Sequence, residues 1–162
     1  MVTYVALLRG IGPSNPNMRP AKLKEAFEKM KLRNVRTVIA SGNVVFESAS
    51  TNEAFLEKKI EKALPLHLGF TSMAIIRSRA DLEAMVKKNP FQNKEHSNRS
   101  YLLVSFLKNK TLVPGGALYT AFNLEEARTP DMMRKLEKKY QKAITSRTWK
   151  TVERILKKMG TR

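Results

Sequence analysis

The sequence predicts an α+β protein of two small subdomains with mainly antiparallel sheets, and the order of its elements leads to this prediction. In the first half of the chain, β-rich runs and amphipathic helix patterns follow one another as strand, helix, strand, strand, helix, strand. This order is typical of the ferredoxin-like (α/β-plait) arrangement, in which both helices cover one face of the sheet. A second α/β-plait unit, less regular, follows without a linker, so we expect subdomains over residues 1–77 and 78–162.

The first subdomain is predicted around a β-hairpin over residues 35–48. Val, Ile, Thr and Phe fill its arms, and Gly42 and Asn43 suit the positive φ of a tight turn. The run 2–9 is apolar on both faces, as in a central strand. The remaining predicted elements are a helix from Pro20, a helix from the capping residues 50–53 to near Pro65, and a strand over 70–77.

The second subdomain is predicted from equally local signals. Ser78 with Asp81 three residues later marks a helix start, and Asn89-Pro90 ends that helix. A polar loop over 92–100 precedes the apolar strand 101–107. The remaining predicted elements are a strand over 117–122, a helix from Thr129-Pro130-Asp131, a short strand at 144–146 and a final helix that ends at Gly160.

Charge is the strongest global signal in the composition. The chain holds 31 Lys and Arg against 14 Asp and Glu, a net charge of +17. Residues 128–162 alone hold twelve basic and three acidic residues. This excess favours polyanions such as RNA or DNA, and a solubilising lysine-rich surface is the alternative.

Several classes of function receive little support. The chain has no cysteine and no apolar run long enough to span a bilayer, and its first residues form a predicted strand without a basic leader, so we expect a cytoplasmic protein without disulfides. His67 and His96, the two histidines, lack metal-ligand spacing, and no P-loop or Gly-x-Ser-x-Gly motif is present. We therefore expect no metal, no cofactor and no catalytic constellation, and the sequence shows no sign of its oligomeric state.

One candidate ligand site lies at the turns of the first subdomain. Arg9 and Gly10 follow the first strand and lead toward a helix N-terminus, where backbone N–H groups and a guanidinium can hold a phosphate. Ser41, Gly42 and Asn43 add donors on the hairpin turn. We expect the two turns at opposite ends of the sheet, which argues against a joint site, and the alternative is that these residues only shape turns.

The final helix is the second candidate, as a polyanion surface. At about 100° per residue, its apolar side chains share one arc. Trp149 belongs to that arc and is predicted to be a core anchor rather than a platform for base stacking. The basic arc is predicted to contain Arg147, Lys150, Arg154, Lys157 and Lys158.

Aromatic residues on the first and third strands suggest a comparison with RNA-recognition sheets. Tyr4 and Phe46 fall on such strands, but Ser41 to Ser48 contains one aromatic residue where that signature requires three. We therefore predict that Tyr4 and Phe46 belong to the core.

Four spaced motifs indicate a family. They are Tyr4-Val-Ala-Leu-Leu-Arg-Gly-Ile11, Ser41-Gly-Asn-Val-Val-Phe46, Asn89-Pro-Phe91 and Ser146-Arg-Thr-Trp-Lys-Thr-Val152. In this order they resemble the bacterial proteins grouped as domain of unknown function family 1697, over essentially the whole chain. The resemblance implies two tandem α/β-plait subdomains and no established reaction. The loops at 12–19 and 127–131 depart from the family pattern.

Two hypotheses and a third alternative follow. The first is a non-enzymatic binder of nucleic acid that uses the basic C-terminal surface. The second is an enzyme or sensor for a small phosphorylated molecule near Arg9 and Gly10. A protein-interaction module is the third.

Overall fold

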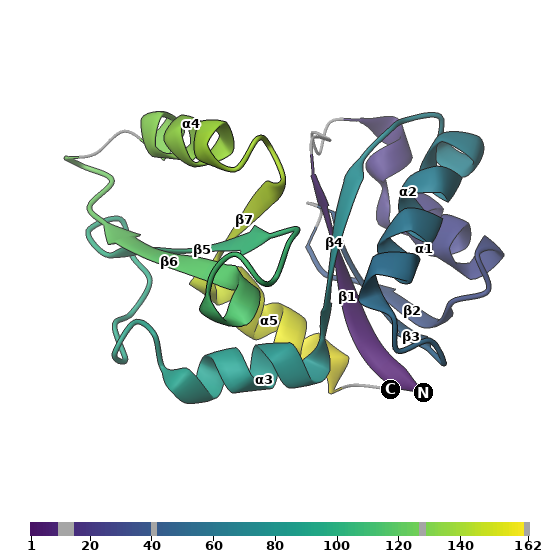
Figure 1. Cartoon of the computed structure of the whole chain (residues 1–162), viewed down its shortest axis with the longest axis horizontal. Helices are drawn as coiled ribbons and strands as arrows, with labels where there is room; N and C mark the ends of the chain where they lie inside the picture. The colour runs from purple at the N-terminus through teal and green to yellow at the C-terminus, as the bar shows by residue number, and fades with distance from the viewer. Residues whose placement is uncertain (10–14, 40–41, 127–128, 161–162) are drawn as a thin grey trace. The chain divides into compact units, whose positions relative to one another are not determined.

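Figure 1 shows the computed structural model, which describes residues 1–9, 15–39, 42–126 and 129–160. Through these residues, helices and strands follow one another in nearly the order that the sequence predicts. The elements are β1 (Val2–Arg9), η1 (Pro16–Met18), α1 (Pro20–Lys29), β2 (Arg33–Thr37), β3 (Asn43–Ser48), α2 (Glu53–Leu68), β4 (Met73–Ser78), α3 (Arg79–Lys88), β5 (Tyr101–Leu107), η2 (Pro114–Gly116), β6 (Ala117–Phe122), α4 (Thr129–Lys139), β7 (Ile144–Thr148) and α5 (Trp149–Met159). The protein is α+β, with two antiparallel sheets.

The chain forms two compact units. Unit 1 contains residues 1–82 together with the C-terminal stretch from Arg154, and unit 2 contains Glu83–Glu153. The boundary predicted between residues 77 and 78 falls inside unit 1. Helix α5 contributes to both units, because its first residues belong to unit 2 and its last residues to unit 1.

Unit 1 is built on a four-stranded sheet with the order β2-β3-β1-β4. Its core lies on the side of α1 and α2, where Tyr4 and Phe46 are 2% and 0% exposed. The Tyr4 and Phe46 rings lie 5.7 Å apart, and Phe27 of α1 lies 5.9 Å from Phe46. The prediction that both strand aromatics belong to the core is confirmed.

The opposite face of the same sheet is buried too. Val5 and Leu7 of β1 are at most 1% exposed, as are Val45 of β3 and Ile75 of β4. A strand with apolar residues on both faces is therefore central, as predicted for β1. Arg77 of β4 shares this face, and burial lowers the pKa of its guanidinium, partly offset by the carboxylates of Glu53, Asp81 and Glu57.

Helix α2 protects an open edge of this sheet. Strand β4 is at the end of the strand order, so alternate backbone N–H groups face away from β1. Glu57 Oε1 accepts a hydrogen bond from the Ile76 N–H at 3.0 Å, and Glu61 Oε1 accepts one from the Ala74 N–H at 3.5 Å. These two carboxylates, one turn apart on α2, occupy edge donors that would otherwise be available to another strand.

The end of α2 corrects one prediction. Pro65 lies inside the helix, which continues to Leu68. Gly69 ends it instead, in the left-handed conformation at φ 72°, and its N–H donates to the Pro65 carbonyl at 3.1 Å. A glycine at this position adopts a positive φ without strain, which explains why the helix ends here.

Unit 2 is built on a three-stranded sheet with the order β6-β5-β7. The central strand β5 is buried along most of its length, and it pairs with β6 from Tyr101 opposite Phe122 and with β7 from Leu107 opposite Ile144. Helix α3 leads into this unit from unit 1, and the helix start predicted at Ser78 is confirmed, because Ser78 and Asp81 exchange reciprocal hydrogen bonds at the beginning of α3. In Figure 1, α4 and α5 lie on opposite sides of the strands of this sheet.

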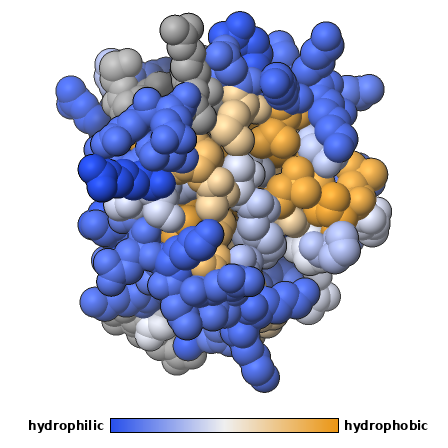
Figure 2. Space-filling model, turned by 90° about the vertical axis from the view of Figure 1, so that its left-hand side faces the viewer, coloured by the Kyte–Doolittle hydropathy of each residue, from blue (hydrophilic) through white to orange (hydrophobic). Residues whose placement is uncertain are grey.

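Partly exposed apolar side chains occur on β6 and α4. Figure 2 shows one face of the molecule, with hydrophobic side chains (orange) gathered in a band between hydrophilic ones (blue). Within unit 2, the half-buried apolar residues of these two elements are Leu118, Tyr119, Phe122, Met132, Met133 and Leu136. The apolar side of α4 is therefore only partly covered.

Candidate functional site

The turn residues of unit 1 lie at the same end of the sheet, and not at opposite ends as the sequence analysis predicts. The Leu8 N–H donates to the Gly42 carbonyl at 2.9 Å, and Leu7 is the register partner of Asn43. The prediction is wrong because β1 and β3 run antiparallel, so the end of one strand meets the start of the other. Gly10 and Ser41, two members of the predicted anion site, lie outside the described residues.

The other members of that site have structural contacts. The Ser72 hydroxyl accepts from the Arg9 N–H at 3.1 Å and donates to the Arg9 carbonyl at 2.8 Å. Asn43 is 1% exposed, and its side-chain amide donates to the Val38 carbonyl at 3.0 Å. Gly42 is buried at φ 76°. Gly42 and Asn43 thus shape the hairpin turn and are enclosed by it, so neither offers a surface to an anion.

Helix α5 presents the clearest array of cations. Its buried side consists of Val152, Ile155 and Met159, each at most 2% exposed. Its exposed residues are Lys150, Glu153, Arg154, Lys157 and Lys158. At about 100° per residue, the four cations share one arc and Glu153 lies at its margin.

Three of the four exposed cations of α5 have no ion pair within the residues that the structure describes. Within the described part of the chain, no carboxylate forms an ion pair with Lys150, Arg154 or Lys158. The C-terminal end of α5 is capped within unit 1, because Arg36 Nη1 of β2 donates to the Lys158 carbonyl at 2.9 Å. We call the exposed cations Lys150, Arg154, Lys157 and Lys158 the α5 basic face.

Arg147 does not belong to this face, although the sequence analysis places it there. It lies in β7, before α5 begins, and its Nη1 donates to Thr145 Oγ1 at 2.8 Å and to the Ser146 carbonyl at 2.9 Å. Burial lowers the pKa of Arg147 to about 10, so the group is still charged at neutral pH. The prediction fails because helical periodicity was extended across two strand residues.

A second set of cations lies on α4. Arg134, Lys135, Lys138 and Lys139 are exposed, and Arg134 forms an ion pair with Asp131 at 3.4 Å. The exposed cations of residues 129–160 thus lie on two different helices.

Unit 2 also contains a pocket that the sequence analysis does not predict. Its volume is about 680 Å³, and it lies between the end of α3, the following loop and the first turns of α5. Phe91 and Trp149, from two of the four motifs quoted above, meet here with their ring centroids 5.3 Å apart. The two motifs are the sequence signal that could have indicated this pocket. Nothing local in the sequence shows that the two motifs lie side by side in the fold.

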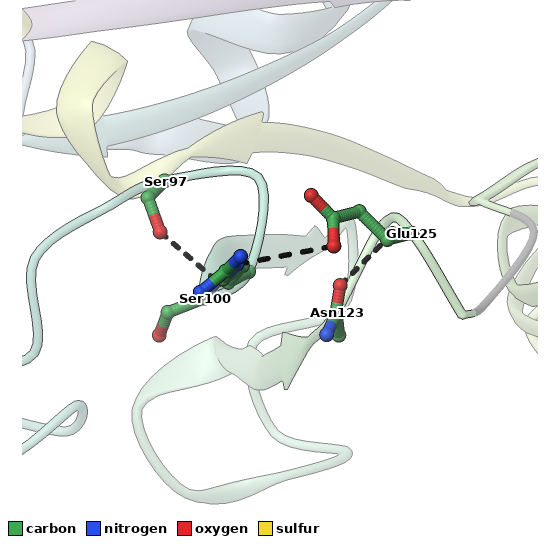
Figure 3. A network of polar contacts seen from close by, with 5 residues as sticks. Ser97, Ser100, Asn123 and Glu125 are labelled. Atoms are coloured by element: carbon green, nitrogen blue, oxygen red, sulfur yellow. Dashed lines mark hydrogen bonds and ion pairs between the residues drawn. The ribbon is translucent and has the colours of Figure 1, made fainter.

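Hydrogen bonds hold the loop that forms one wall of this pocket. Beyond His96 the chain turns at Ser97, whose hydroxyl accepts from the Ser100 N–H at 3.1 Å (Figure 3). The segment after β6 fixes this turn, because the Asn98 carbonyl accepts from the Leu124 N–H at 2.8 Å and Arg99 lies 3.9 Å from Glu125. The loop predicted as polar and exposed is thus anchored to its own unit.

The described residues offer neither a cluster of metal ligands nor a helix that could cross a membrane. Among the residues that the structure describes, no group of three or more His, Asp or Glu side chains is arranged to hold a metal ion. Within the same residues, no helix combines the length and apolar character that crossing a bilayer requires.

Comparisons with known proteins define the family but no activity. A solved structure described as "The structure of conserved bacterial protein SP0830 from Streptococcus pneumoniae" matches with a TM-score of 0.75 and 23% sequence identity, covering 99% of each chain. At this identity the match shows a shared fold. No curated protein matches the chain. The profile of the family described as "Protein of unknown function (DUF1697)" matches residues 1–131, and the chain belongs to that family.

Proposed function

We propose that the protein binds nucleic acid, without catalysing a reaction, through the α5 basic face. The observation that supports this proposal is the arrangement of the cations of α5, all four exposed on one arc, with the one acid of the helix at the margin. Lys150 and Arg154 are one turn apart, about 6 Å along the axis, and Lys157 continues the row. Such a row can follow a phosphate backbone and release its condensed counterions.

The net charge adds to this argument in a different way. At +17 the whole chain attracts polyanions over the range of a Debye length, about 8 Å at physiological salt. That attraction speeds encounter but does not select a surface. The α5 basic face supplies the selection, because its cations are free of ion pairs at Lys150, Arg154 and Lys158 in the described residues.

The test compares two variants with the same loss of charge. One carries Lys150→Gln, Arg154→Gln and Lys157→Gln on α5, and the other carries Arg134→Gln, Lys135→Gln and Lys138→Gln on α4. Binding of a labelled short single-stranded oligonucleotide is measured by fluorescence anisotropy at fixed salt. We expect the α5 variant to lose about tenfold in affinity and the α4 variant to lose little, since each exposed charge contact is worth about 0.2–1 kcal/mol. Equal losses would show that binding follows net charge alone.

A small phosphorylated ligand near Arg9 and Gly10 is the second proposal, and it has less support. The enclosed amide of Asn43 is engaged with Val38, which removes one of the donors expected there. A ligand-induced rise in melting temperature that disappears in Arg9→Ala would favour it. No shift with a panel of nucleotides and sugar phosphates would count against it.

A protein-interaction module is the third proposal. The partly exposed apolar residues of β6 and α4 support it, since exposed apolar surface is typical of interaction sites. Self-association in sedimentation velocity that is lost in Met133→Glu would favour it. Whichever of the three functions applies, we propose a cytoplasmic location, as the sequence predicts.

We also infer the finer fold class from the topology. The βαββαβ order and the strand order β2-β3-β1-β4 of unit 1 support a ferredoxin-like fold. For unit 2, which has three strands, we propose a less regular form of the same ferredoxin-like fold.

A further inference from the structure

The pocket of unit 2 has the size of a ligand site. Its volume of about 680 Å³ lies within the range of roughly 300–1,000 Å³ that is usual for such sites. Every residue that lines it belongs to unit 2. One side is formed by the end of α3 and the loop that carries Phe91 and His96, and the other by Trp149, Lys150 and Glu153 of α5.

The aromatic walls of the pocket are held in place by other rings. Phe91 is 6% exposed and packs edge-on against Tyr119 at 5.8 Å and against Trp149 at 5.3 Å. Trp149 itself is only half-buried, so part of its indole surface remains available in the pocket. Trp149 therefore acts as a core anchor, as predicted, only where its ring packs on Phe91.

His96 is fixed by a hydrogen bond and by stacking. Its Nδ1 accepts from the Leu102 N–H at 3.1 Å, and its ring lies 4.6 Å from the ring of Tyr101. Since Nδ1 is an acceptor, the proton of the neutral imidazole is on Nε2. The pocket is therefore lined by two aromatic side chains that pack on each other and by an imidazole held by a hydrogen bond and a ring contact.

The charged residues of the pocket balance one another. Lys94 and Lys150 are matched in number by Glu95 and Glu153, and all four side chains are exposed. A pocket without net charge does not select an anion, but it offers donors and acceptors to a flat, uncharged, polar ring. Lys150 connects the two features, because it lines the pocket and is the first cation of the α5 basic face.

We infer that this pocket receives an unpaired nucleobase of the strand whose phosphates lie along the α5 basic face, with the base stacked on Trp149. The inference rests on the proposed function and names its ligand more narrowly as a single strand. Every base has a π-face, so stacking on an indole tolerates any sequence. A duplex, whose bases are paired and stacked inside, cannot supply the ring.

The chain contains a reporter at the site, because Trp149 is its one tryptophan. The emission of Trp149 and the binding affinity are measured with a short single strand, with an abasic strand of the same length, and with the corresponding duplex. We expect the single strand to quench Trp149 and to bind about 5- to 150-fold more tightly than the abasic strand, which is the range for stacking one base. The abasic strand and the duplex should bind with little quenching.

A second variant separates the pocket from the core. Trp149→Ala removes a ring that packs on Phe91, so a loss of binding in that variant could reflect unfolding. Val86 lines the pocket and is 37% exposed, and Val86→Phe fills the space from a surface position. We expect Val86→Phe to lose the preference for the single strand over the abasic strand and to keep the abasic affinity.

The possible outcomes distinguish the two proposals. If the abasic and normal strands bind equally and change Trp149 emission equally, or if Val86→Phe keeps the preference, the pocket inference is overturned and the α5 basic face remains. If neither strand binds, both proposals are overturned.

Discussion

Removing the Glu57 carboxylate tests how the open edge of the unit 1 sheet is protected. Glu57 is 6% exposed, and its Oε1 accepts from the Ile76 N–H at 3.0 Å. In Glu57→Ala this buried N–H loses its acceptor, and an unsatisfied buried donor costs about 1–3 kcal/mol. In Glu57→Gln an amide oxygen can still accept, so the expected loss is below about 1 kcal/mol.

The assay is urea unfolding together with amide hydrogen exchange at Ile76. We expect Glu57→Ala to lower the free energy of unfolding by about 2 kcal/mol and to speed exchange at Ile76. Glu28→Ala is the control, since Glu28 is an exposed partner of Lys24 at 3.9 Å and such pairs contribute less than about 0.5 kcal/mol. If the alanine and glutamine variants of Glu57 were equally stable, the proposed role of this carboxylate would be refuted.

Three further predictions concern residues of the candidate sites. Gly42→Ala should lower the free energy of unfolding by about 1–2 kcal/mol or more, because φ is 76° and a Cβ would lie 3.1 Å from Leu8 Cβ; thermal denaturation measures this. Asn43→Ala should lower the free energy of unfolding by about 1–3 kcal/mol, because the buried Val38 carbonyl loses its donor. A variant that lost phosphate-ligand binding and kept the wild-type stability would contradict this. Arg147→Met should leave oligonucleotide affinity within about twofold, because that guanidinium is enclosed beside β7; a drop like that of Lys150→Gln, in the same anisotropy assay, would return Arg147 to the binding surface.

Local signals in the sequence predict most of the elements of this fold. Apolar alternation locates β5, and the capping pattern of Ser78 and Asp81 locates the start of α3. These signals act over a few residues, so one chain segment contains them completely. Pro65 shows their limit, because the residue that ends α2 is Gly69, which adopts a positive φ and whose N–H donates to the Pro65 carbonyl.

The candidate site is less accessible to sequence reasoning, because it depends on contacts between distant segments. Helical periodicity correctly places Lys150, Arg154 and Lys157 together, but it cannot show that Arg147 still belongs to a strand. The pocket requires Phe91, far away in the sequence, to meet Trp149. The strand pairings of unit 2 join segments that are distant in the sequence, and no periodicity within a segment indicates which others become its neighbours.

The salt dependence of binding tests the central claim most directly. The slope of log affinity against log salt concentration is measured for the wild-type chain and for the variant with Lys150→Gln, Arg154→Gln and Lys157→Gln. Each phosphate contact on a single strand contributes about 0.7 to the magnitude of this slope, so losing three contacts should reduce it by about 2. If the wild-type chain binds and its slope equals the slope of the variant, the claim that α5 holds the phosphates is contradicted.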